Sequence, residues 1–179
     1  MKSKTTSTAR KAPQNSSTLD VIIETPKGSR NKLKYEPENR KFKLSKIMPE
    51  GMMFPYDFGF VPSTKAEDGD PLDVLVLTDA PLFPGCLVEC RLIGAIEAEQ
   101  TQEGRTNRND RLIAVAGPSL LYSEIENLQE LNPQVLKQIE AFFVNYQRAR
   151  GVEVEILGHS GPQKAHQLVN KASHKKEAA

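Results

Sequence analysis

The sequence predicts an α+β protein in which a long helix packs on a small, closed or nearly closed β-barrel. Two observations predict this class. Short runs of β-branched and aliphatic residues, separated by turn residues, fill the chain from 19 to 116. Beyond residue 131 the apolar residues recur at helical spacing instead. The 179 residues suit one domain with a substantial core, and they contain no internal repeat.

The barrel strands are expected mainly in the first two thirds of the chain. The segment 48–62, M-P-E-G-M-M-F-P-Y-D-F-G-F-V-P, has three prolines and four aromatic residues. It is therefore expected to be irregular and to lead into a short strand at Phe60. The other expected strands cover residues 19–24, 33–35, 41–44, 74–77, 87–96, 112–116 and 152–157, with a hairpin around P-E-N-R.

The last third of the chain predicts the long helix. Asn132 is a suitable N-cap, and Pro133 suits the first helical position. Apolar residues at helical spacing continue to Tyr146, and Gly151 ends the helix. A short final helix is expected over 164–172.

Composition bounds the domain and its partners. The basic, hydroxyl-rich start MKSKTTSTARKAPQNSST is typical of a disordered tail, with an organelle transit peptide as the alternative. We expect a disordered basic tail over 1–17, a folded domain over 18–172 and a frayed tail over 173–179. A net charge of +1 argues against a dominant nucleic-acid or membrane-surface role. Cys86 and Cys90 are expected to be buried thiols of a reducing, cytoplasmic compartment.

Three aspartates stand at the start of one expected strand. In A-E-D-G-D-P-L-D, residues 66–73, Asp68, Asp70 and Asp73 lie within six residues. Carboxylates are ligands of hard divalent cations, and the D-G-D-P turn should present them rather than leave them mobile. An EF-hand is excluded because Asp73 stands at position six and Asp79 at position twelve. A solvated acidic turn is the alternative.

Basic and aromatic residues elsewhere on the expected strands favour a site. Carboxylate-bound metal ions faced by lysine and arginine are typical of phosphoryl transfer. No P-loop or glycine-rich dinucleotide motif is present, so a nucleotide need not be the substrate. The residues concerned are Lys34, Lys46, Arg111, Tyr35, Tyr56 and Tyr146, with the acids Glu24 and Glu36.

The segment E-D-G-D-P-L-D-V-L-V resembles the signature of the family I soluble inorganic pyrophosphatases. The resemblance extends over I-I-E-T-P, K-Y-E, F-P-Y-D-F-G-F-V, P-G-C-L-V-E-C-R-L-I-G-A-I, R-L-I-A-V-A and F-F-V-N-Y. It implies an OB-like, five-stranded barrel with flanking C-terminal helices. It also implies hydrolysis of pyrophosphate to two phosphates with several Mg²⁺ ions, with Mn²⁺ or Zn²⁺ as alternatives, and a homo-oligomer, usually a hexamer.

The resemblance also implies roles for individual residues. Asp70 would be the general base and a metal ligand. The other metal ligands would be Asp68, Asp73 and Glu24, and the phosphate contacts would come from Lys34 and Tyr146. Where this chain departs from the family pattern, we expect Asp110 to bind metal and Lys46 and Arg111 to contact phosphate.

Several positions depart from the family pattern. Lys46 replaces an arginine, and Phe58 replaces a tyrosine. The lysine that should follow Tyr146 is Gln147, with Arg148 as the candidate to compensate.

The loop E-Q-T-Q-E-G-R-T-N-R-N-D-R departs furthest. It is about two residues longer than usual, with Asn109 in place of a metal-binding aspartate and Arg111 in place of a lysine. We expect a bulge that turns Asp110 or Glu103 inward, so that one of them joins Asp68 and Asp73 in binding metal.

Three functions remain open on these residues. The intact D-G-D-P-L-D favours a working pyrophosphatase, because a binding module needs no general base. The altered loop favours a non-catalytic or regulatory phosphate- or pyrophosphate-binding barrel, or a hydrolase of another phosphoanhydride.

Overall fold

The computed structural model describes residues 18–177, so the expected tail over 1–17 lies outside the described residues. Within this range the chain forms strands, two α-helices and one 3-10 helix. In chain order they are β1 (Thr18–Thr25), β2 (Asn31–Glu36), β3 (Lys41–Ile47), β4 (Asp57–Phe60), β5 (Asp73–Leu77), β6 (Leu87–Gln102), β7 (Arg105–Arg108), β8 (Arg111–Ala116), η1 (Leu128–Glu130), α1 (Pro133–Arg148), β9 (Glu153–Ser160) and α2 (Pro162–Glu177).

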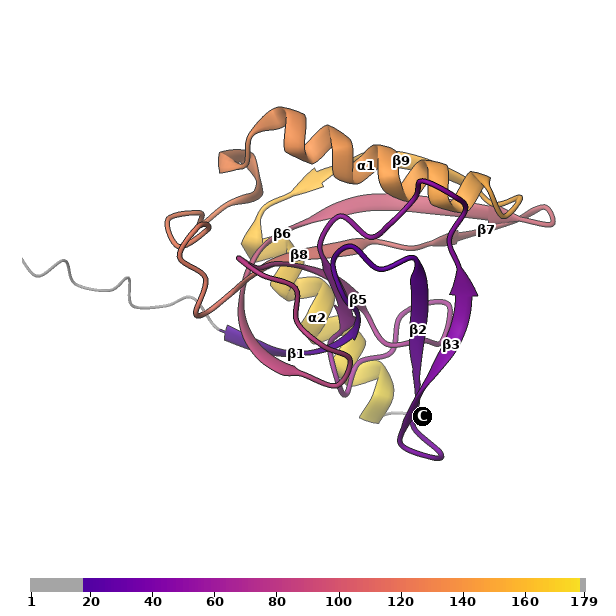
Figure 1. Cartoon of the computed structure of the whole chain (residues 1–179), viewed down its shortest axis with the longest axis horizontal. Helices are drawn as coiled ribbons and strands as arrows, with labels where there is room; N and C mark the ends of the chain where they lie inside the picture. The colour runs from indigo at the N-terminus through magenta and orange to yellow at the C-terminus, as the bar shows by residue number, and fades with distance from the viewer. Residues whose placement is uncertain (1–17, 178–179) are drawn as a thin grey trace, which may run out of the picture.

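Five strands close into a ring in the order β1–β4–β5–β8–β6, because β6 pairs back with β1. The β5–β8 pair is parallel, and the other pairs of the ring are antiparallel. The long β6 extends beyond the ring and pairs there with β7 and β9. The β2–β3 hairpin stands beside the ring (Figure 1). This arrangement confirms the expected α+β class and the OB-like, five-stranded barrel.

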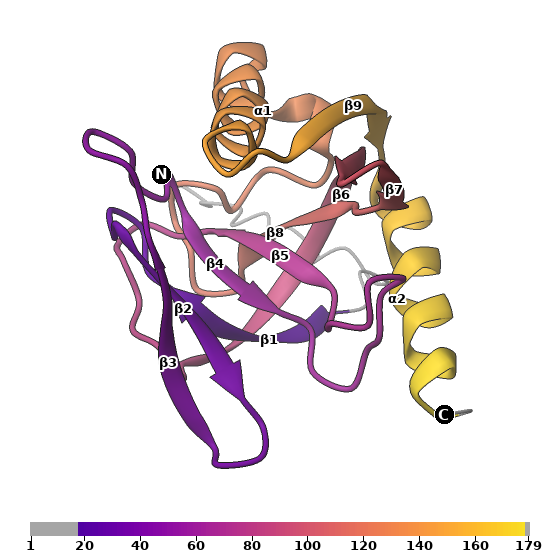
Figure 2. The same ribbon diagram turned by 90° about the vertical axis from the view of Figure 1, so that its right-hand side faces the viewer.

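The two helices cover different sides of the barrel. One apolar cluster packs barrel residues such as Leu75 and Ile113 against Ile139 and Phe143 of α1. A second cluster packs the barrel against α2, which Figure 2 shows on the side opposite the β2–β3 hairpin. Within the described part of the chain, no helix is long and apolar enough to cross a membrane.

Two buried features of β4 hold β1 in place. The fully buried carboxylate of Asp57 accepts hydrogen bonds from the backbone N–H of Lys27 at 2.8 Å and from the hydroxyl of Thr78 at 2.6 Å. A Cβ at Gly59 would lie 2.2 Å from the carbonyl oxygen of Ile22, so only glycine allows this approach. The two contacts place the end of β1 where the candidate site begins.

The sequence prediction was wrong on β7. The chain turns back at Glu103 and Gly104, both with positive φ (51° and 74°), and Arg105–Arg108 then pairs with β6. Two successive left-handed residues form the kind of two-residue turn that favours a hairpin. Helix α2 also differs, because it starts at Pro162 and continues past Ala172 to Glu177.

Candidate active site

A cavity of about 670 Å³ lies where β1, the β2–β3 hairpin, the loop before β5 and the end of α1 meet. Its charged lining comes from segments far apart in the sequence. The acids are Glu24, Glu36, Asp68, Asp70 and Asp73, and the cations are Lys32, Lys34, Lys46, Arg111 and Arg150. The sequence therefore named most of the charged lining but missed Lys32 and Arg150. Lys32 could have been found, because it stands two residues before Lys34 on the same strand.

The loop between β4 and β5 presents the aspartates through a tight turn. Gly69 adopts a φ of 90°, a left-handed conformation that favours glycine. The backbone N–H of Asp70 donates to Asp68 Oδ1 at 3.1 Å, and the N–H of Ala66 donates to the Asp70 carbonyl at 2.7 Å. The D-G-D-P segment is thus a defined turn with its carboxylates on the cavity, as expected.

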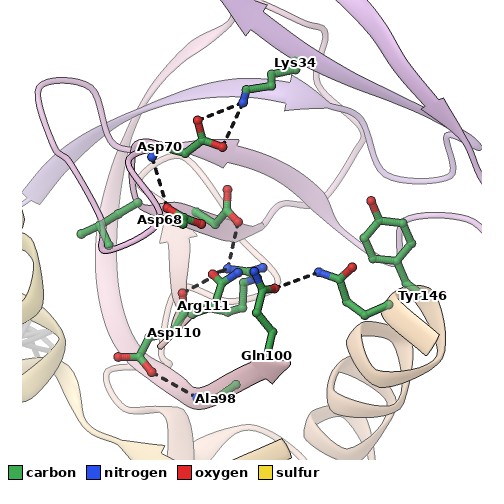
Figure 3. A network of polar contacts seen from close by, with 12 residues as sticks. Lys34, Asp68, Asp70, Ala98, Gln100, Asp110, Arg111 and Tyr146 are labelled. Atoms are coloured by element: carbon green, nitrogen blue, oxygen red, sulfur yellow. Dashed lines mark hydrogen bonds and ion pairs between the residues drawn. The ribbon is translucent and has the colours of Figure 1, made fainter. Parts of the chain in front are cut away.

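Two of these carboxylates face cations across the cavity (Figure 3). The Lys34 ammonium lies 2.9 Å from both oxygens of Asp70, and this hydrogen bond raises the pKa of Lys34. Arg111 Nη1 lies 2.9 Å from Asp73 Oδ2. The site thus places cationic groups directly against the expected metal ligands.

Crowding and burial work against ionisation of two further acids of the lining, Asp68 and Glu24. Burial, and then the nearby charges of Asp73 and Asp70, raise the pKa of Asp68. Glu24 is only 7% exposed, and burial above all raises its pKa to about 7, although the Tyr35 N–H donates to it at 2.7 Å. A divalent cation would favour the ionised form of both carboxylates.

Hard oxygen donors of this kind fit a divalent metal ion. Among the described residues no three Asp, Glu, His or Cys side chains are yet gathered for one ion. Asp70 and Asp73 are each turned toward a cation instead. The donor chemistry fits the metal, and binding would require these carboxylates to exchange a cationic side chain for the ion.

Positively charged side chains are grouped in another part of the lining. Burial, and then the neighbouring charges of Arg150, Lys32 and Lys34, lower the pKa of Lys46 to about 8. Mutual repulsion of this kind is relieved when an anion binds among the cations. This half of the cavity is therefore suited to phosphate oxygens.

Tyr146 lies behind this positive group and is not among the residues that line the cavity. Its ring packs against the ammonium of Lys32 at 5.6 Å and the guanidinium of Arg150 at 5.5 Å, measured to the ring centroid. Both cations line the cavity, so Tyr146 supports them.

Asp110 and Glu103, the two acids expected from the altered loop, lie outside the cavity described above. Asp110 Oδ1 accepts a hydrogen bond from the Ala98 N–H at 3.1 Å (Figure 3). It accepts a second one from Arg108 Nε at 2.7 Å. The carboxylate thus completes the pairing with β6 in the gap between β7 and β8.

Asp110 also lines a smaller hollow of about 200 Å³ together with Asp68 and Asp73. Glu103 is exposed at the tip of the β6–β7 hairpin. That Asp110 binds metal beside Asp68 and Asp73 therefore stays a prediction.

Part of the cavity lining consists of neutral amides, and one of them, Asn109, stands where an aspartate was expected. We define the amide face as the four amide side chains of the lining, Gln100, Gln102, Asn109 and Gln147. Asn109 accepts a hydrogen bond from Arg111, and Gln147 accepts one from Arg150. Arg148, the residue expected to compensate for Gln147, lines a different surface hollow beside Glu153 and Glu155. The cation that reaches the cavity from this helix end is Arg150.

Carboxylates for metal ions on one side and a group of cations on the other define a metal-dependent enzyme acting on condensed phosphate. The family model for inorganic pyrophosphatase matches residues 21–177. The chain therefore belongs to the inorganic pyrophosphatase family.

Individual relatives agree with this assignment. The inorganic pyrophosphatase of Methanosarcina acetivorans is 36% identical over 152 residues, which cover 85% of this chain and 88% of that protein. The one from Nanoarchaeum equitans is 37% identical over 153 residues, covering 85% and 93%. The crystal structure of inorganic pyrophosphatase from Thermus thermophilus superposes with a TM-score of 0.82 at 31% identity, covering 93% of this chain and 95% of that one.

Proposed function

We propose that this protein hydrolyses inorganic pyrophosphate to two phosphates, with Mg²⁺ as its metal cofactor and Mn²⁺ or Zn²⁺ as possible substitutes. Family membership supports the reaction, and one observation in this chain carries it. A single cavity is lined both by the carboxylates of Asp68, Asp70 and Asp73 and by a group of cations. The protein is thus an inorganic diphosphatase, a hydrolase of phosphoric anhydrides. Homohexameric assembly and a cytoplasmic location stay predictions.

Each side of the cavity has its own task in this proposal. Asp68, Asp73 and Glu24 would hold the metal ions. Asp70 lies on the same loop as Asp68 and would also bind a metal ion. The bound ions would supply positive charge that polarises a phosphoryl group and lowers the pKa of water. The cationic lining would neutralise the phosphate oxygens and orient the substrate.

The reaction itself breaks one bond and forms another. The water oxygen bonds to one phosphorus atom, and the bond from that phosphorus to the bridging oxygen breaks. Asp70 accepts the proton of the attacking water as general base. Lys34, which bonds both oxygens of Asp70 in this structure, would turn to a phosphate oxygen when the substrate binds.

The amide face favours a second candidate function. A lining with fewer carboxylates offers less negative charge to metal ions and therefore binds them more weakly. Weak metal binding suits a non-catalytic barrel that binds phosphate or pyrophosphate. The acidic loop stays intact in this chain, and for that reason hydrolysis is the function we put first.

A phosphate-release assay distinguishes these functions. We expect purified protein to release phosphate from pyrophosphate with Mg²⁺, to lose this activity in EDTA, and to act little on ATP or phosphate monoesters, because the chain has no nucleotide motif. Binding of pyrophosphate without phosphate release in Mg²⁺, Mn²⁺ or Zn²⁺ would identify the binding barrel. Faster release from another phosphoanhydride would identify that compound as the substrate class.

A further inference from the structure

A chain of hydrogen bonds crosses the amide face and ends on Arg150. Gln147 Nε2 donates to Gln100 Oε1 at 3.3 Å, and Arg150 Nη1 donates to Gln147 Oε1 at 2.7 Å. Gln147 is only 7% exposed, so its amide is held in one orientation between β6 and the arginine. These hydrogen bonds link β6 of the barrel to the Arg150 guanidinium, which lies beyond the end of α1.

The backbone and an aromatic ring hold the same arginine. The Arg150 N–H donates to the Gln147 carbonyl at 2.9 Å, and Gly151 follows with a φ of 71°. The guanidinium carbon lies 5.5 Å from the centroid of the Tyr146 ring, and Nη1 lies 3.5 Å from the tyrosine hydroxyl. Within the described residues, the side-chain hydrogen bonds of Arg150 all leave from Nη1. Its Nε and Nη2 donors are therefore available to a ligand.

The surroundings of Arg150 suit an anion better than a metal ion. Lys46, Lys32 and Lys34 line the same cavity, and the positive charge of Arg150 helps to lower the pKa of Lys46. The amide face beside it contributes neutral oxygens only, which bind a hard cation more weakly than carboxylates do. A planar guanidinium matches two phosphate oxygens at once.

We propose that Arg150 binds one phosphate group of pyrophosphate directly, and that Gln147 and Gln100 are positioning residues for its guanidinium. One end of the substrate is then held by protein cations without a bridging metal ion, while the other end lies toward the aspartate loop. This inference rests on the proposed function for the identity of the substrate.

The test is calorimetric titration of the full-length protein with pyrophosphate in EDTA, where binding is measured without turnover. We expect the wild type to bind, and Arg150→Gln to weaken the affinity at least about tenfold, as the loss of a charge-assisted hydrogen bond predicts. Arg148→Gln is the matched control, because it removes the same charge two residues away, outside this cavity. It should change the affinity by less than about twofold, because exposed charges are screened.

A double-mutant cycle tests the positioning role. Gln147→Met removes both side-chain hydrogen bonds at similar volume and should weaken binding in the wild type. It should cause no further loss when Arg150 is already glutamine, because its effect passes through the arginine. Equal losses in both backgrounds would make Gln147 a structural residue only and overturn that role.

Two other outcomes would overturn the phosphate contact itself. These are no binding of pyrophosphate by the wild type in EDTA, and equal affinities of the Arg150→Gln and Arg148→Gln variants. A different result would refute the proposed function. A protein that binds in EDTA through Arg150 but releases no phosphate with any divalent cation would uphold this inference and refute the hydrolase.

Discussion

Asp70→Asn should lower the turnover of pyrophosphate by roughly 100-fold to 10,000-fold, the usual effect of removing a general base. Asparagine keeps the shape of the side chain but cannot accept the proton of the attacking water. The fold should be little affected, because the side chains of Asp70 and Lys34 are 58% and 45% exposed and their ion pair stabilises little. Steady-state phosphate release and thermal unfolding in EDTA measure the two effects.

Asp20→Asn is the control for this variant. It makes the same change of charge on an exposed part of β1 that does not line the cavity. The control should retain wild-type turnover. If Asp70→Asn also retained it, Asp70 would not be the base, and if it unfolded in EDTA far below the control, Asp70 would be a structural turn residue.

Glu24→Gln should raise the stability of the metal-free protein at pH 8. Burial raises the pKa of Glu24 from 4.5 to about 7, so the ionised carboxylate is disfavoured in the folded state. The stability of the metal-free wild type therefore falls as the pH rises from 4.5 through 7. At 1.36 kcal/mol per pKa unit the variant gains up to about 3 kcal/mol at pH 8. The glutamine oxygen can still accept the Tyr35 N–H.

The gain should be largely lost at pH 4.5, where Glu24 is protonated in the folded state and half protonated in the unfolded state, and it should vanish below that pH. Saturating Mg²⁺ should stabilise the wild type more than the variant if Glu24 is a metal ligand. Urea unfolding at pH 8 and pH 4.5, with EDTA or Mg²⁺, gives the comparison. Glu38→Gln in the exposed hairpin turn is the control and should change stability little. A variant less stable than the wild type in EDTA at pH 8 would contradict the account.

The elements predicted best were those whose signals are local. Asn132 caps α1 as expected, with its side chain accepting from the Gln134 N–H at 2.9 Å. The closed ring followed from short apolar runs, which belong to its strands. Strand β7 was missed because R-T-N-R is polar throughout, and its pairing depends on the left-handed turn at Glu103 rather than on burial.

The site could be predicted where one segment of the sequence supplies several functional groups. It could not be predicted where a residue's role depends on the direction in which its side chain points. The aspartate loop could be recognised from its own residues. For Asp110 the sequence could not show that the Ala98 N–H, left without a strand partner, would take the carboxylate as acceptor. The choice between Arg148 and Arg150 depends on where α1 ends, since a residue beyond the helix points in another direction.

The central claim is that the carboxylates of Asp68, Asp70 and Asp73 hold the metal ions across the cavity from the cationic lining. Anomalous diffraction from crystals grown with Mn²⁺ and non-hydrolysable imidodiphosphate tests it most directly. The account predicts manganese peaks at about 2 Å from these carboxylates, the distance of direct coordination. It also predicts a phosphate group against Arg150. Manganese bound only elsewhere, or at Asp110 in place of the three aspartates, would contradict it.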